Sequence, residues 1–130
     1  MQDAKPFFLI LLHIAILDME AITNTLGLVK TTQTPVFVVM NAIAPQGHEG
    51  DEAAEAIAAL DVEVCPARVV NRVAFSRSLI TGKTAQDFEP DSKAAQEIEQ
   101  LHMFMCKHLQ TCTNEQTGVP QHVEQIRRRA

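Results

Sequence analysis

The stretch "TPVFVVMNA", residues 34–42, decides the fold. It is rich in β-branched and apolar residues, and its only proline stands at the start, where a strand tolerates one. A short apolar run of this kind is typical of a strand that is buried on both faces. Such strands lie inside parallel sheets covered by helices, so the stretch predicts an α/β fold.

Two other strand-like runs flank this one, "PFFLILLH" at 6–13 and "VEVCP" at 62–66. Helical periodicity fills the remaining segments, and it predicts helices over 17–30, 51–60, 69–81 and 91–109. The alternation predicts right-handed crossovers and a parallel sheet of about three strands covered by helices. Three strands make a thin sheet, and runs this apolar usually have neighbours on both sides. We therefore expect an unpaired sheet edge that favours self-association.

Several local signals set the expected ends of these elements. Asp18 is the expected N-cap of the first helix, and Gly82 is expected to cap the end of the third. "AQDFEP" at 85–90 is expected to form a turn. Residues 1–109 form the expected domain, and residues 110–130 are expected to be a loose polar tail that ends in Arg127-Arg128-Arg129.

The composition is that of an ordinary globular domain of 130 residues, with 46% hydrophobic and 21% charged residues. No apolar run reaches membrane-spanning length, so no membrane partner is expected. The net charge of −5 argues against affinity for nucleic acid over the whole surface. Three cysteines at irregular spacing favour a reducing compartment, and we expect a cytoplasmic location.

Gly82-Lys83-Thr84 is spelled like the end of a phosphate-binding loop. Such a loop needs a glycine five residues before Gly82, a strand before it and a helix after it. Arg77 occupies that first position, and a predicted helix precedes Gly82. The tripeptide is therefore expected to be a helix cap followed by a solvated lysine.

Cations gather in one segment of the chain. Between Cys65 and Lys83 there are four basic residues and no acid: Arg68, Arg72, Arg77 and Lys83. The 64 residues before this segment hold two lysines, no arginine and nine acids. A local basic face can hold DNA phosphates despite a negative total charge. The alternative is a solvated helix face that pairs with the acidic helix at 51–55.

Histidines and cysteines near the end of the last helix suggest a metal site, and we reject it. They are His102, Cys106, His108 and Cys112. On a helix His102 and His108 lie on different sides, about 120° apart at about 100° per residue. Side chains packed in or near the core are the better interpretation, and no metal is expected. Cys65 likewise has no accompanying base, so we interpret it as a small buried apolar residue.

From residue 6 to about 109 the chain resembles the C-terminal half of ParA/MinD-type partition ATPases, nearest the ParA plasmid and chromosome partition proteins. The matching pieces include "ILDMEAI", "VFVVMNA" and "VEVCPARV". The most specific block, residues 71–101, carries Arg72, Val73-Ala74-Phe75, Gly82, Glu89-Pro90 and Ala94-Ala95-Gln96-Glu97. The resemblance implies a partial P-loop NTPase-like sheet that lacks the half with the Walker A loop.

Family members use ATP and Mg²⁺, held by a two-lysine Walker A loop and by aspartates that this sequence does not contain. We therefore expect no ATP hydrolysis, and no cofactor, for this chain alone. The resemblance implies that Asn41 and Pro66 contact the adenine base. It also implies non-specific DNA binding through the segment with Arg68, Arg72, Arg77 and Lys83, and contact with a ParB-type adaptor.

Two alternatives stay open at this stage. The chain is a structural domain that completes another subunit's sheet, or it is an unrelated small cytoplasmic enzyme that uses Cys65 or a histidine. No Ser, Cys or carboxylate stands beside an orienting histidine at a recognisable spacing, which weakens the second alternative.

Overall fold

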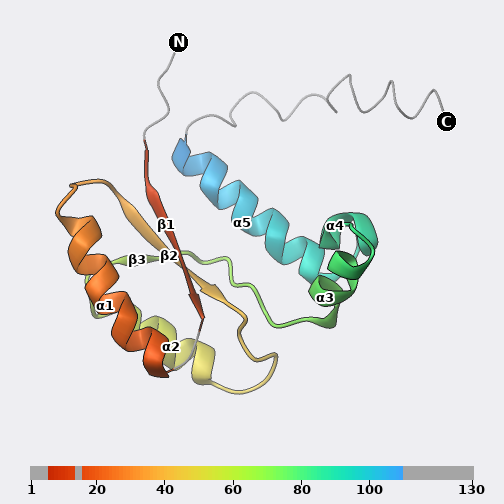
Figure 1. The fold of residues 1–130 in the computed structure, drawn as a ribbon, viewed down its shortest axis with the longest axis horizontal. Helices are drawn as coiled ribbons and strands as arrows, with labels where there is room; N and C mark the ends of the chain where they lie inside the picture. The colour runs from red at the N-terminus through yellow and green to blue at the C-terminus, as the bar shows by residue number, and fades with distance from the viewer. Residues whose placement is uncertain (1–5, 14–15, 110–130) are drawn as a thin grey trace, which may run out of the picture.

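A computed structural model describes residues 6–13 and 16–109 of the chain (Figure 1). The predicted tail with its three arginines, and Cys112, lie outside the described residues. In these described ranges, three strands and five helices follow one another: β1 (Phe8–His13), α1 (Ile16–Lys30), β2 (Val36–Asn41), α2 (Glu49–Ala58), β3 (Glu63–Val64), α3 (Val73–Ile80), α4 (Ala85–Phe88) and α5 (Lys93–Leu109).

The three strands form one parallel sheet in the order β1-β2-β3, which confirms the predicted α/β architecture. Phe8 is aligned with Val36 and His13 with Asn41, so β1 and β2 are paired over their full lengths. β2 pairs with β3 at Phe37 and Val38 only. Within the described residues no helix is both long and apolar enough to cross a bilayer.

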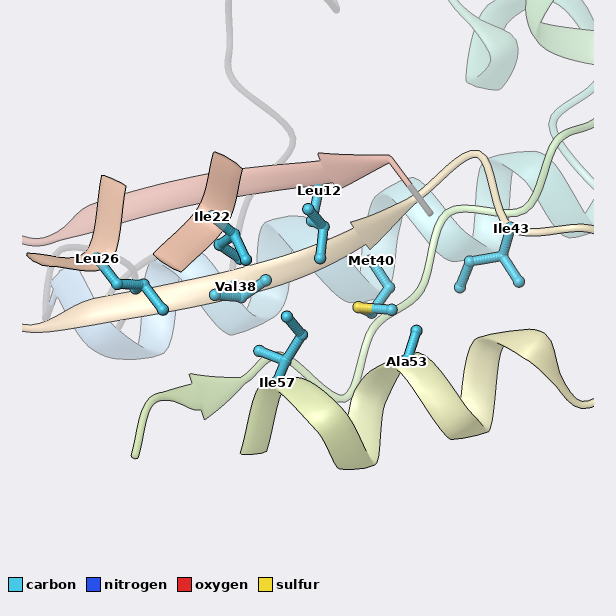
Figure 2. Packing of buried hydrophobic residues seen from close by; sticks show 8 residues of the cluster. All are labelled: Leu12, Ile22, Leu26, Val38, Met40, Ile43, Ala53 and Ile57. Carbon is cyan, nitrogen blue, oxygen red and sulfur yellow. The ribbon is translucent and has the colours of Figure 1, made fainter. Parts of the chain in front are cut away.

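β2 is the centre of the fold, and its side chains alternate between two apolar clusters. On one face, residues of α1 and α2 pack against β2, as Figure 2 shows. That cluster consists of Leu12, Ile22, Leu26, Val38, Met40, Ile43, Ala53 and Ile57. Val38 and Met40 have no exposed surface, because the helices that follow β1 and β2 cover this face together.

The other face of β2 packs against α5 and α3. Val39, Cys65, Ala67 and Val69 form the buried part of this second cluster. Around them lie Leu9, Phe75, Ile98, Leu101 and Phe104. The ring of Phe37 contacts those of Phe104 and His108 edge-on or tilted, with centroids 5.1 and 4.3 Å apart. The face of α5 that packs inward therefore includes Ala94, Ile98 and Leu101.

The predicted helix over 69–81 is wrong at its start, since α3 begins only at Val73. Residues before it stay extended because their backbone pairs with the end of β2 and with the chain just beyond it. The Val69 N–H donates to the Met40 carbonyl at 2.9 Å, and the Asn71 N–H donates to the Ile43 carbonyl at 2.8 Å. Tertiary pairing therefore overrides the helical periodicity of the segment.

Three smaller predictions also need correction. β3 covers only Glu63–Val64 rather than 62–66, although the Cys65 N–H still donates to the Val38 carbonyl at 2.8 Å. The expected turn at 85–90 contains a short helix, α4, whose N-cap is Thr84. Asp18 lies in the first turn of α1 rather than before it, where its charge still suits the helix dipole.

Gly82 ends α3 as predicted, in the left-handed conformation with φ of 67°. Its N–H donates to the Leu79 carbonyl at 3.1 Å, and the Lys83 N–H donates to the Ser78 carbonyl at 2.9 Å. These two bonds form the Schellman motif that closes many helices.

Substituting Gly82→Ala should lower the free energy of unfolding by about 1 kcal/mol, because alanine is strained at positive φ. A Cβ there would touch nothing within 4 Å, so backbone strain is the only expected effect. Gly27→Ala, inside α1 and equally free of contacts, is the matched control. It should be stabilising, by up to about 1 kcal/mol. Urea denaturation of both variants checks this, and shifts of the same sign would contradict the assignment.

Candidate functional site

Polar side chains lie at the carboxyl-terminal ends of β1 and β2. Open α/β folds place ligand contacts at this end of the sheet. Asn41 ends β2 and is aligned with His13, which ends β1. The next residue, Ala42, has φ of 54°, a conformation that is rare for alanine and re-aims the chain after the strand. Within the described part of the chain, the Asn41 side-chain amide forms no hydrogen bond. It is therefore available to a ligand.

Pro66 lies on the neighbouring segment, at the same end of the sheet. It is exposed, whereas Cys65 and Ala67 on either side are buried in the second cluster. Pro66 thus stands at the surface of an otherwise anchored segment. The adenine contact of Asn41 and Pro66 stays a prediction.

His13 interacts with Asp18 at this end of the sheet. Its Nδ1 lies 3.2 Å from Asp18 Oδ2, and both side chains are exposed. A histidine oriented by a carboxylate is half of a catalytic arrangement, but it needs a nucleophile or a metal to act on a substrate. Groups of three or more metal-ligating side chains are absent from the described residues.

The Gly82-Lys83-Thr84 tripeptide is a connection between two helices. A phosphate loop binds its ligand through free backbone N–H groups. Here the N–H groups of Gly82 and Lys83 both donate to carbonyls of α3. Thr84 caps α4, since its Oγ1 accepts a hydrogen bond from the Asp87 N–H at 3.1 Å. The geometry agrees with the rejection of a phosphate site.

The four cations of the basic segment differ in their surroundings. Arg68 Nη1 donates a hydrogen bond to Asp51 Oδ1 at 2.6 Å, which is the pairing with the acidic helix that the sequence left open. Hydrogen bonding to Arg68, together with its charge, lowers the pKa of the Asp51 carboxyl. This pair holds the segment after β3 against α2.

Arg72 is more deeply engaged. Its Nε and Nη2 donate to Glu97 Oε1 at 2.9 and 2.6 Å. The other oxygen of Glu97 accepts a hydrogen bond from the Val70 N–H at 3.2 Å. The side chains are only 27% and 14% exposed, so this partly buried pair ties the start of α3 to α5. The guanidinium is consequently occupied in the free protein.

Arg77 and Lys83 are exposed at the carboxyl-terminal end of α3 and just beyond it. Neither forms an ion pair with any described residue. Leu79 and Ile80 lie between them in the chain and are 77% and 85% exposed. The sequence did not single out Leu79 and Ile80 as exposed, because helical periodicity places them at the end of an ordinary helix.

The histidines of α5 have structural surroundings. His108 Nδ1 lies 2.9 Å from the Phe104 carbonyl oxygen, and its ring packs among those of Phe7, Phe37 and Phe104. His102 Nε2 lies 3.3 Å from Cys106 Sγ, one helical turn away. His102 and His108 thus face different surroundings, in line with the reasoning from helical geometry.

Cys65 is 1% exposed and lies beside an open hollow of about 790 Å³ between α2 and the segment after β3. The hollow is lined by Asp51, Ala54, Glu55, Ala58, Val64, Cys65, Pro66 and Arg68, and it contains no histidine. Burial raises the pKa of the Cys65 thiol, which disfavours the nucleophilic thiolate. An enzyme based on Cys65 has no support in this geometry.

Comparisons with known proteins give no family. No family model, no curated protein and no solved structure matches the chain.

Arg72→Ala should lower the free energy of unfolding by about 2 kcal/mol, because it leaves the Glu97 carboxylate buried with only one hydrogen bond. Arg77→Ala removes the same charge from an exposed site and should change stability by less than about 0.5 kcal/mol. Denaturation of both variants, and a double-mutant cycle with Glu97→Gln, measures the coupling. Equal effects for the two arginines would exclude the structural role of Arg72.

Cys65 should be alkylated by iodoacetamide at pH 7 far more slowly in the native protein than in urea, because the thiol is buried and its pKa is raised. Digestion followed by mass spectrometry identifies the modified cysteine. Native labelling of Cys65 at the unfolded rate would show that the thiol is reachable and would revive the enzyme alternative.

Proposed function

We propose that the chain is a ParA-like partition-protein domain that binds DNA non-specifically through Arg77 and Lys83 and does not hydrolyse ATP on its own. Two features support the family part of this proposal. The block from Arg72 to Glu97 resembles the partition ATPases in sequence. The parallel sheet with helices on both faces is compatible with a P-loop NTPase-like fold.

The observation that carries the DNA part is the division of the basic segment. Arg68 and Arg72 are paired with Asp51 and Glu97, whereas Arg77 and Lys83 have no acidic partner among the described residues. Cations without an acidic partner attract a polyanion even on a protein of negative net charge. No internal ion pair has to be broken before the polyanion binds. The expected DNA site therefore contains only two of the four cations that the sequence suggested, Arg77 and Lys83.

Binding through two cations is expected to be weak and independent of base sequence. Contacts to phosphates fix position but carry no sequence information. Each neutralised phosphate contributes about −0.9 to the slope of log K against log salt, so two contacts give a slope of about −2. Within the described part of the chain, the phenylalanines nearest in sequence to Arg77 and Lys83 are Phe75 and Phe88, and both are partly buried, so neither is a ready platform for base stacking.

ATP fits the described residues only in part. The free side-chain amide of Asn41 has the donors and the acceptor that an adenine edge needs. The amides of Gly82 and Lys83 are already bonded, and they offer nothing to a triphosphate. We therefore derive no step of phosphoryl transfer for this chain. Contact with a ParB-type adaptor is part of the same proposal, and the exposed Leu79 and Ile80 beside the cations suit such a contact.

A second function, the completion of another subunit's sheet, is favoured by one observation. Among the described residues no strand pairs with the outer side of β1, although β1 is as long as β2.

The DNA proposal is tested by fluorescence anisotropy with a random-sequence duplex. Doubling the salt concentration should raise the dissociation constant roughly three- to fourfold. Arg77→Ala/Lys83→Ala should abolish measurable binding. Arg68→Ala should have little effect, because that guanidinium is engaged with Asp51.

The control is Lys30→Ala/Lys107→Ala, which removes the same two charges from α1 and the far end of α5. It should retain most of the binding. Equal losses in both double variants would show a dependence on net charge alone, and unchanged binding in Arg77→Ala/Lys83→Ala would refute the assignment.

A further inference from the structure

The two edges of the sheet differ in length and chemistry. β3 has only two residues, and one of them, Glu63, is charged and exposed. β1 has six residues and carries no Asp, Glu, Lys or Arg. Proteins protect sheet edges with short strands, charges or prolines, and an unprotected edge pairs with another strand. β3 is protected in this way, whereas the part of the chain that the structure describes provides no such protection for β1.

The outer side of β1 also exposes apolar side chains on both faces of the sheet. Leu11 follows Leu9 on the α5 face and is 60% exposed, and Phe8 is 41% exposed on the opposite face. Beside β1 the sheet and α1 border a hollow of about 200 Å³, lined by Ile10, Leu11, Leu12, His13, Asp18, Ala21, Ile22 and Thr25. The α1 residues nearest this edge include the small Ala21 and Thr25, which leave room for a side chain from an added strand.

The backbone geometry favours a second copy of β1 as that strand. The Phe8 N–H donates to the Pro35 carbonyl at 2.8 Å, so the alternate residues Leu9, Leu11 and His13 direct their N–H and C=O groups outward. Two copies related by a two-fold axis perpendicular to the sheet pair antiparallel through these groups. In such pairing, opposite residues lie on the same face of the joined sheet. Leu11 then meets Leu9 or Leu11 of the other copy, so that apolar residues face each other.

No charged side chain among the described residues 6–13 and 16–109 opposes this arrangement at the centre of β1. His13 and Asp18, the nearest titratable pair, lie at the carboxyl end of β1, 3.2 Å apart. In antiparallel pairing, the His13–Asp18 pair of each copy lies toward one outer end of the two paired strands. The residues at the centre of the paired strands are apolar. The two-fold contact uses the same surface on both copies, so the assembly closes at two molecules with a β3 strand at each end of the joined sheet.

We propose that the outer side of β1 is a homodimer interface, through which two copies join into one six-stranded sheet. This inference deepens the second candidate function by naming the partner as another copy of this chain. It does not depend on DNA binding, since Arg77 lies in α3 and Lys83 in the connection after it, and neither belongs to β1.

Light scattering coupled to size-exclusion chromatography tests the proposal on the full chain at concentrations from about 1 to 100 µM. The wild type should be a dimer at the upper end of this range. Leu11→Lys should shift it to a monomer, because each copy would place a lysine among the apolar residues at the centre of the paired strands. Leu11 is largely exposed, so its replacement should leave the circular dichroism spectrum and the melting temperature of the monomer unchanged. Leu28→Lys, at a site on α1 that is also largely exposed, is the matched control and should remain a dimer.

A wild-type chain that stays monomeric at 100 µM would overturn the proposal. A dimer that survives Leu11→Lys, or that Leu28→Lys disrupts equally, would also overturn it. A monomer that captures a strand from a different polypeptide would retain the second candidate function and exclude the second copy. Loss or persistence of DNA binding bears only on the first function, so the two outcomes are separable.

Discussion

The burial of β2 on both faces is the constraint on which the rest of the structure depends. Phe37, Val38, Val39 and Met40 are at most 5% exposed, so the strand needs a covering layer on each side. Each buried aliphatic side chain contributes about 1.5–3 kcal/mol when it is removed from water. α1 and α2 provide one layer, while α5 and α3 provide the other. The candidate site residues lie in or beside the loops that join these strands and helices. The positions of those loops therefore follow from where each strand and helix ends.

Two ion pairs hold the segment between β3 and α3 against these layers, and among the described residues they distinguish the cations that have an acidic partner from those that do not. Asp51 engages Arg68 from α2, and Glu97 engages Arg72 from α5. A segment that looks uniformly basic in the sequence thus divides into two structural arginines and two exposed cations. The end of α3 and the connection after it expose charge from Arg77 and Lys83 and apolar surface from Leu79 and Ile80. The ion-paired arginines and the two exposed cations of this segment are therefore different residues.

Much of the fold could be predicted because its signals are local. The apolar run at 34–42 indicated the central strand, helical periodicity located α1, α2 and α5, and Gly82 marked the end of α3. What failed depends on contacts between distant residues. The extended backbone at 69–71 follows from pairing with Ile43, and no periodicity in the segment itself announces it. The same limit applies to the site, where the charge of Arg72 was visible but its partner, 25 residues away, was not.

Native-state hydrogen exchange on β2 tests most directly the claim that this strand holds the two layers together. The backbone amides of Val38, Val39 and Met40 should exchange only through global unfolding. Their opening free energies should then equal the free energy of unfolding measured with denaturant, and should exceed those of amides near the ends of α1 and α5. Exchange of the β2 amides through a local opening, at lower free energy than those helix ends, would contradict the account.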